Sequence, residues 1–179
     1  MKIDISSIDT VTQFMVHEHL FHGDVVYLVQ PQHIGTKWTQ DNKHLRSSVW
    51  SVDGELISAG LPKFMNFGEN PENFPAPLSL KGCSVIEKCD GSSLIVSKYK
   101  GNFMVRTRGT IDASKMENAH ELREFQPILK KLKRFFSKDT WNFSLIFEWL
   151  SPTNVIVLKD RKSTRLNSSH VSESRMPSS

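Results

Sequence analysis

One segment alternates strictly between apolar and polar side chains, and it predicts the clearest strand of the chain. Residues 140–150 read TWNFSLIFEWL, so the five odd-numbered side chains, all bulky and apolar, share one face. Glu148 points to the opposite, more polar face, where a carboxylate needs a partner because burying it unpaired is costly. A continuous apolar run, Val25–Val29, predicts a second strand, although residues 8–30 as a whole mix helical and extended signals.

Two tight turns predict hairpins. Asp53-Gly54 separates two short apolar stretches within residues 45–59. Lys100-Gly101-Asn102 separates two extended runs, Leu94–Tyr99 and Phe103–Arg108. Both turns join neighbouring strands that run in opposite directions.

Residues 114–137 predict the main helical region, because their apolar side chains recur at helical spacing. Ser114 and Glu117 have the spacing of a capping box. Pro127 predicts a kink or a break into two shorter helices, because proline has no main-chain N–H to donate. Strands joined by tight turns, without a repeated βαβ pattern, predict an α+β fold of antiparallel sheets with intervening helices.

Length and composition suit a single globular domain, with 179 residues of which 38% are apolar. No stretch approaches the ~20 apolar residues that span a membrane. The start of the chain has no apolar stretch of signal-peptide type, so we expect a cytoplasmic protein, or one in the host cytoplasm if it is viral. Cys83 and Cys89 are too few for a disulfide framework or a four-ligand zinc site.

The net charge of +4 at first indicates a nucleic-acid partner. Residues 161–179 hold +3 of it, from Arg161, Lys162, Arg165 and Arg175 against Glu173, so residues 1–160 are nearly neutral. This serine-rich segment has no aromatic residue, which predicts disorder. It also resembles translated adapter or vector sequence, so we expect a non-native tail after Asp160.

The segment Lys88-Cys89-Asp90-Gly91-Ser92 carries the most informative chemistry. A lysine amine can act as a covalent nucleophile once it is neutral, which requires desolvation or neighbouring cations. The candidate cations are Arg46, Lys63, Arg106, Arg108 and a bound metal ion. Gly91 permits close backbone approach to a ligand, and Asp90 could bind a hydroxyl or help to hold Lys88. The four letters K-x-D-G alone also suit a charged surface turn.

Further stretches in the same order extend this pattern, and with them the chain resembles the covalent nucleotidyltransferases. It is most similar to the ATP-dependent RNA ligases of the phage tRNA-repair type. The matching stretches are the arginine element Leu45–Trp50, the K-F-F-N-x-x-E-like element Lys63–Glu69, the acceptor motif Lys88–Ser92, the basic-x-basic-Gly stretch Arg106–Gly109, and Phe147–Trp149 with its extension Ser151–Val157. Two later motifs of that family, an acidic-Gly element and a K-x-K-like element, do not occur. Residues 1–160 therefore resemble the amino-terminal part of a truncated nucleotidyltransferase (adenylyltransferase) domain with an ATP-grasp-like ligase core.

The resemblance implies a catalytic role for Lys88, which would attack the α-phosphate of ATP and carry AMP. AMP would pass to an RNA 5′-phosphate, and a 3′-hydroxyl would then displace it and seal the strand, as in RNA or tRNA repair. The cofactors implied are ATP and Mg²⁺, with no protein ligands assigned to the metal ion. The nucleotide-binding residues implied are Arg46, Lys63, Asp90, Gly91, Arg108 and Glu148, with Arg108 close to the nucleotide or the RNA end.

Two alternatives share parts of this pattern. A DNA ligase or a GTP-using capping enzyme has the same lysine motif, although Ser92 and the Lys63–Glu69 element favour an RNA ligase. A non-catalytic nucleotide- or RNA-binding module would retain the binding residues without turnover. The natural RNA partner and the oligomeric state do not follow from the sequence.

Overall fold

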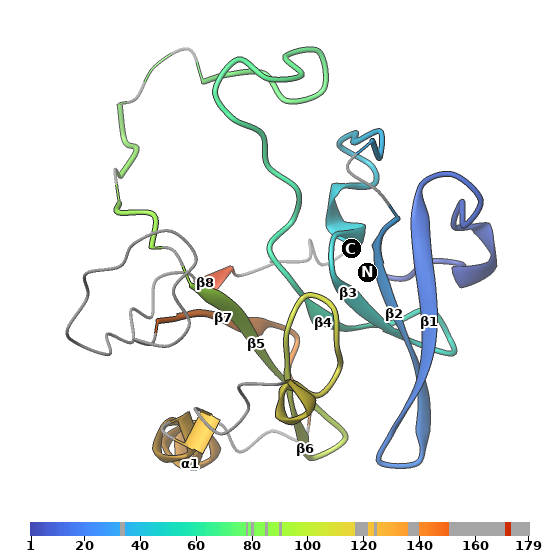
Figure 1. The fold of residues 1–179 in the computed structure, drawn as a ribbon, viewed down its shortest axis with the longest axis vertical. Coiled ribbons are helices and arrows are strands. Elements are labelled where there is room, and N and C mark those ends of the chain that lie inside the picture. Colours follow the sequence, from blue (N-terminus) through green and yellow to red (C-terminus); the bar gives the residue numbers. More distant parts are fainter. Residues whose placement is uncertain are drawn as a thin grey trace.

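The structure, a computed structural model, describes residues 1–32, 35–77, 79, 81–84, 86–89, 91–116, 122–123, 125–135, 140–150 and 171–172. These residues form two four-stranded antiparallel sheets that lie side by side (Figure 1). The first sheet has the order β1-β2-β3-β4, with β1 Phe14–Phe21, β2 Asp24–Pro31, β3 Ser48–Ser51 and β4 Leu56–Ala59. The second has the order β6-β5-β7-β8, with β5 Ser92–Tyr99, β6 Asn102–Arg106, β7 Ser144–Trp149 and β8 Val171–Ser172.

The helical content of the described residues is small. One α-helix, α1 Gln126–Phe135, lies beside the second sheet (Figure 1). Short 3₁₀ turns occur at η1 Ile5–Ser7, η2 Lys43–Leu45 and η3 Ala113–Lys115. The described part of the chain is thus mostly β, which is compatible with the predicted α+β class. None of its helices has the length and apolar character needed to cross a bilayer.

The predicted hairpins are confirmed. Asp53-Gly54 connects β3 to β4, and Gly54 has a φ of +73°. Lys100 and Gly101 connect β5 to β6 with φ values of +46° and +81°, the positive values that a two-residue hairpin turn of type I′ requires. Tight turns of this kind set the register, since Tyr99 pairs directly with Asn102.

The first hairpin differs from the expectation for residues 8–30. Val25–Val29 lies in β2 as predicted, but the helical part of that expectation is wrong, because residues 14–21 form β1. His22 and Gly23, with φ values of +50° and +90°, turn the chain back on itself. Pairing with β2 along the whole of β1 therefore overrides the mixed local signal.

The helical region is also shorter than predicted. Pro127 is the second residue of α1, where a missing main-chain N–H costs nothing, so the expected break into shorter helices is confirmed. The predicted capping role of Ser114 is wrong. Asp112 is the N-cap of η3, and its carboxylate accepts the Ser114 amide at 3.0 Å. Glu117 lies outside the described residues.

Apolar side chains pack in three clusters on both sides of the sheets. One joins β5 and β7 to α1, as the alternation on residues 140–150 predicts, with Phe147 and Trp149 buried. A second fills the space between the sheets, where Met104 of β6 meets Val26, Leu28 and Val49. The third lies on the far side of the first sheet around Trp50.

The opposite face of β7 is buried as well, since it faces the first sheet. Ser144 Oγ accepts the main-chain amide of Ala59 in β4 at 2.9 Å and lies 2.9 Å from Ser97 Oγ. Ser97 Oγ in turn donates to Ser58 Oγ at 2.7 Å. A row of buried serines thus joins the sheets, and these three residues (Ser58, Ser97, Ser144) are called the serine seam below.

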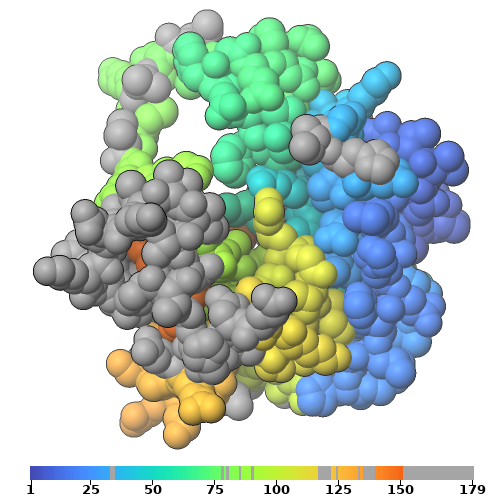
Figure 2. Space-filling view, in the orientation of Figure 1, coloured from blue at the N-terminus to red at the C-terminus, as the bar shows by residue number. Residues whose placement is uncertain are grey.

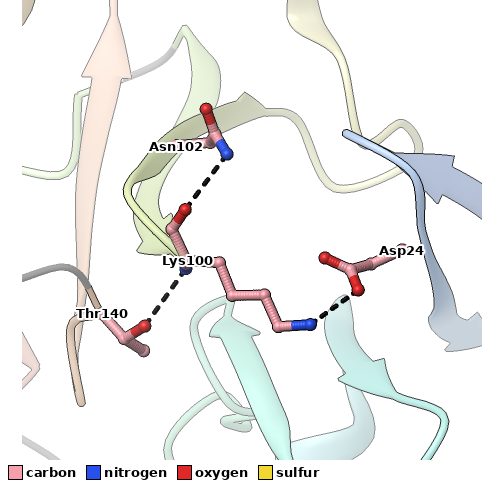
Figure 3. A network of polar contacts seen from close by, with 4 residues as sticks. All are labelled: Asp24, Lys100, Asn102 and Thr140. Carbon is pink, nitrogen blue, oxygen red and sulfur yellow. Dashed lines mark hydrogen bonds and ion pairs between the residues drawn. The ribbon is translucent and has the colours of Figure 1, made fainter.

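An exposed ion pair also connects the two sheets (Figure 3). Lys100 Nζ lies 2.6 Å from Asp24 Oδ1, so the β5–β6 turn is held to the first residue of β2. The Lys100 main chain is fixed at the same time, because its amide donates to Thr140 Oγ1 at 3.1 Å and its carbonyl accepts from Asn102 Nδ2 at 3.2 Å. The sheets are therefore connected both by the buried serine seam and by this ion pair.

The predicted tail from residue 161 and the extension Ser151–Val157 lie outside the described residues, apart from Val171–Ser172, which pair with β7.

Candidate functional site

The acceptor motif meets the end of β7. The main-chain amide of Gly91 donates to Glu148 Oε1 at 3.0 Å, across 57 positions of sequence. Ser92 and Ser93 at the start of β5 pair with Trp149 and Glu148 at the end of β7. The partner that the half-buried Glu148 carboxylate requires is thus a main-chain N–H of the lysine motif.

Gly91 is packed too closely for any side chain. A Cβ atom at this position would lie 2.2 Å from the Trp149 carbonyl oxygen and 2.8 Å from Leu150 Cδ2. The close approach that glycine permits here is therefore an approach to the backbone of β7. This contact determines where the motif enters β5.

Lys88 precedes this anchored point by three residues, and its side chain is exposed. Within the described residues, no hydrogen bond or ion pair holds its ammonium group. The desolvation that a neutral nucleophilic amine requires is therefore not present at Lys88 in this structure. Cys89 is half-buried, and Asp90 lies outside the described residues. The segment that carries Lys88 arches away from the sheets after β4 and returns at β5 (Figures 1 and 2).

Arg46 lies against an aromatic ring and beside a second arginine. Its Cζ atom is 5.4 Å from the centre of the Phe64 ring, within the range of a cation–π contact. Burial lowers the pKa of Arg46, and the nearby charge of Arg108 lowers it further. Among the described residues neither guanidinium has an ion-pair partner, so the two positive charges together attract an anion.

The Lys63 element is anchored next to Arg46. The Lys63 amide donates to the carbonyl of Lys43 at 2.9 Å, and Lys43 begins the 3₁₀ turn that ends just before Arg46. Met65 packs against the cluster around Trp50, whereas Phe64 remains more than half exposed. The two elements, whose basic residues Arg46 and Lys63 are 17 positions apart in the sequence, therefore form one surface around Arg46.

Arg106 does not face this surface. It was expected among the cations around Lys88, but its side chain is fully buried between the sheets, and it donates to Ser47 and Ser58. Desolvation lowers its pKa to about 9, so the guanidinium keeps its proton at neutral pH. Arg108, two residues further on, is exposed. Of the basic-x-basic-Gly stretch, only Arg108 can reach a ligand at the surface.

The structure thus forms two groups of the predicted residues, Arg46 with Arg108 and Gly91 with Glu148. Both lie at the same end of the sheets: Arg106, which ends β6, pairs with Ile95, three residues beyond Ser92 at the start of β5. No hydrogen bond or ion pair among the described residues connects one group to the other, and none joins Lys88 or the Lys63 side chain to either.

Two structural roles were not found from the sequence: the interior position of Arg106 and the contact that Ser47 makes with it. The interior position of Arg106 had one signal, since Met104 and Arg106 are two apart on a strand and must share a face. Ser47 had no signal, because its role depends on a contact with Arg106, which is 59 residues away.

Comparison with known proteins identifies the class. The sequence pattern that defines a family described as RNA ligase matches residues 38–176. A protein of Thermovibrio ammonificans named "Putative RNA ligase" is 30% identical over 109 residues, which is 60% of this chain and 28% of that relative. The chain belongs to the RNA ligase family. This chain spans little more than a quarter of the length of the Thermovibrio ammonificans protein.

The residues around Arg46 fit a nucleotide. Its phosphates would neutralise the Arg46–Arg108 pair, and the exposed ring of Phe64 offers an apolar surface beside them. Among the described residues, no three His, Cys, Asp or Glu side chains gather in a way that would hold a metal ion.

Proposed function

We propose that this chain carries nucleotidyltransferase chemistry for an ATP-dependent RNA ligase that joins a 5′-phosphate to a 3′-hydroxyl, as in RNA or tRNA repair. The observation that supports this proposal is the bond from the Gly91 amide to Glu148, which unites two motifs that the ligase reaction requires in one place. Family membership and the neighbouring positive charges of Arg46 and Arg108 support the same proposal.

The first step would occur at Lys88 Nζ. The neutral amine attacks the α-phosphorus of ATP, the bond from that phosphorus to the bridging oxygen breaks, and pyrophosphate leaves while the amine proton passes to solvent. In the second step the RNA 5′-phosphate oxygen attacks the same phosphorus and the P–N bond to Lys88 breaks. In the third, the 3′-hydroxyl attacks the 5′-phosphorus, forms the phosphodiester and releases AMP.

The other residues would bind and orient the nucleotide. Arg46, Lys63 and Arg108 would neutralise phosphate charge, which is the main requirement of phosphoryl-type transfer. Asp90 and Glu148 would hold the ribose, and Gly91 would keep the acceptor motif against β7. Mg²⁺ would supply further charge neutralisation at the phosphates. Since Lys88 is exposed in this structure, nucleotide binding would have to bring Arg46 and Arg108 and the lysine segment together.

Labelling with ATP tests the proposal on the full-length product of the gene. Incubation with Mg²⁺ and ATP labelled at the α-phosphate should give an acid-labile protein adduct, and ATP labelled at the γ-phosphate should give none. Lys88→Ala should abolish the adduct, because no other amine would occupy the acceptor position. Lys81→Ala is the matched control, since it removes another exposed lysine of the same segment and should label normally.

The other outcomes decide between the alternatives. An adduct formed with GTP and not with ATP would move the assignment to capping chemistry. Sealing of nicked DNA in preference to RNA ends would indicate a DNA ligase. Absence of any adduct in the full-length protein would reject the enzyme, and nucleotide binding without labelling would then identify a binding module.

A further inference from the structure

Arg106 makes an unusual set of contacts for a buried charge. All five of its N–H donors are used: Nε donates to Ser58 Oγ (2.7 Å), Nη1 to Ser47 Oγ (2.9 Å) and to the Thr107 carbonyl (3.0 Å), and Nη2 to the Ser47 carbonyl (2.7 Å) and the Ser58 carbonyl (3.2 Å). None of these acceptors is a carboxylate. A buried cation held only by hydroxyls and carbonyls contributes little to stability by itself. Its five hydrogen bonds do, however, fix the positions of the residues that accept them.

Two of the five bonds hold Ser47, whose backbone is in a rare conformation. Ser47 has a φ of +57°, in the left-handed region that residues with a Cβ seldom adopt. Its carbonyl accepts both from Arg106 Nη2 and from the Gly60 amide, the latter at 3.0 Å. These contacts from β6 and from the end of β4 hold the conformation that Ser47 would not keep alone.

The left-handed turn at Ser47 sets the direction of Arg46. Arg46 is the preceding residue and has extended backbone angles, φ −64° and ψ 102°. The turn that follows it lets the chain enter β3 while the Arg46 side chain lies over Phe64 and beside Arg108. If Ser47 relaxed to a negative φ, the Arg46 guanidinium would leave this position.

We propose that Arg106 is a positioning residue, which locks Ser47 in the left-handed conformation and thereby aims Arg46 at the anion that Arg46 and Arg108 share. This inference rests on the proposed function for the identity of that anion, the phosphates of ATP. Lysine cannot replace Arg106, because an ammonium group lacks the planar fork that reaches the Ser47 and Ser58 acceptors together.

The test compares Arg106→Lys, Ser47→Gly and a matched control in the full-length protein. Ser97→Ala is the control, because it removes a hydroxyl of the serine seam without touching Ser47. Arg106→Lys should raise the ATP concentration for half-maximal adduct about tenfold, the effect of one misaligned charge-assisted hydrogen bond. Its maximal rate at saturating ATP should change much less. Ser47→Gly removes the Oγ that Arg106 Nη1 reaches and frees the backbone to leave the left-handed region, so it should shift the ATP requirement in the same direction.

A second readout does not depend on activity. The NMR resonance of the Arg46 Nε–Hε group should move in Arg106→Lys and in Ser47→Gly and stay in place in Ser97→Ala. Lack of adduct in the wild-type protein would reject the proposed function, and the NMR comparison would still decide the positioning role. An unmoved Arg46 resonance in both variants, or an ATP requirement that changes as much in Ser97→Ala as in Arg106→Lys, would overturn the inference.

Discussion

Glu148 Oε1 accepts the main-chain amide of Gly91 at 3.0 Å, and this bond joins the start of β5 to the end of β7. The acceptor lysine lies three positions before Gly91 on a segment that otherwise arches away from the sheets (Figure 2). The bond therefore fixes the end of the lysine segment that enters β5, whereas its start is held by the bond from the Lys63 amide to the Lys43 carbonyl.

Gly91→Ala should destabilise the protein. The new Cβ would lie 2.2 Å from the Trp149 carbonyl oxygen, so β5 and β7 would have to separate, at a cost of about 1–3 kcal/mol for overpacking. Urea unfolding measures this change. Gly35→Ala is the control, because a Cβ there meets nothing within 4 Å. Equal stability of the two variants would contradict the close packing at Gly91.

Glu148→Gln and Glu148→Ala should behave differently. The glutamine side chain keeps an oxygen that can accept the Gly91 amide, whereas alanine removes the acceptor and costs about 1–2 kcal/mol. In thermal unfolding, wild type and Glu148→Gln should therefore have similar Tm values, and the Tm of Glu148→Ala should be lower than both. If Glu148 also holds the ribose, both variants should form adduct more slowly. A glutamine variant as unstable as the alanine variant would show that the hydrogen bond is not what matters.

Arg108→Ala should weaken ATP binding without destabilising the fold. Arg108 lowers the pKa of Arg46, which means that the two charges repel one another in the absence of an anion. Removal of Arg108 relieves this repulsion, so Tm should stay constant or rise, while the ATP concentration for half-maximal adduct should increase about tenfold. Arg46→Ala should raise the same concentration, and the double variant should show less than the product of the single effects. A fall in Tm for Arg108→Ala would argue against mutual repulsion.

Asp24→Asn should have a small effect that depends on salt and pH. The hydrogen bond to Asp24 raises the pKa of Lys100 above its ordinary value of 10.5. The contribution of the pair is therefore complete below that value and is lost as the pH rises through the higher pKa of the folded state. The Lys100 side chain is exposed and that of Asp24 is partly exposed, so salt should screen the effect. Melting curves at low and high salt measure the change in Tm caused by Asp24→Asn. Glu72→Gln is the control, because it alters an exposed carboxylate elsewhere. A difference that persists in high salt would contradict an exposed ion pair.

Local sequence signals correctly predicted the turns and the strand whose geometry depends on residues close in sequence. Asp53-Gly54 and Lys100-Gly101 form the turns expected of them, because Gly54 and Gly101 adopt positive φ values without steric cost. The alternation on residues 140–150 placed β7 and its apolar face correctly. The helical signal in residues 8–30 gave a wrong prediction, because β1 is stabilised by its pairing with β2 and not by its own propensity.

For the candidate site too, some features were predictable from the sequence and others were not. The order of the motifs indicated the RNA ligase family, and the family match confirms it. The chemistry assigned to Lys88, Arg46, Lys63, Asp90, Gly91, Arg108 and Glu148 remains a prediction. For Arg106 the sequence showed the charge and the strand face that it shares with Met104, but its burial between the two sheets away from Lys88 became visible only in the structure.

The sequence by itself determined the family, the hairpins and the residue types available for nucleotide chemistry, because these depend on local backbone preferences and on the order of short motifs. Only the tertiary structure decided which of two arginines, separated by a single residue, reaches the surface. Arg106 shares the inward face of β6 with Met104, and the acceptors that satisfy its buried guanidinium come from Ser47 and Ser58 of the other sheet. Such partners are brought together by the packing of the two sheets, so no local pattern around Arg106 could identify them.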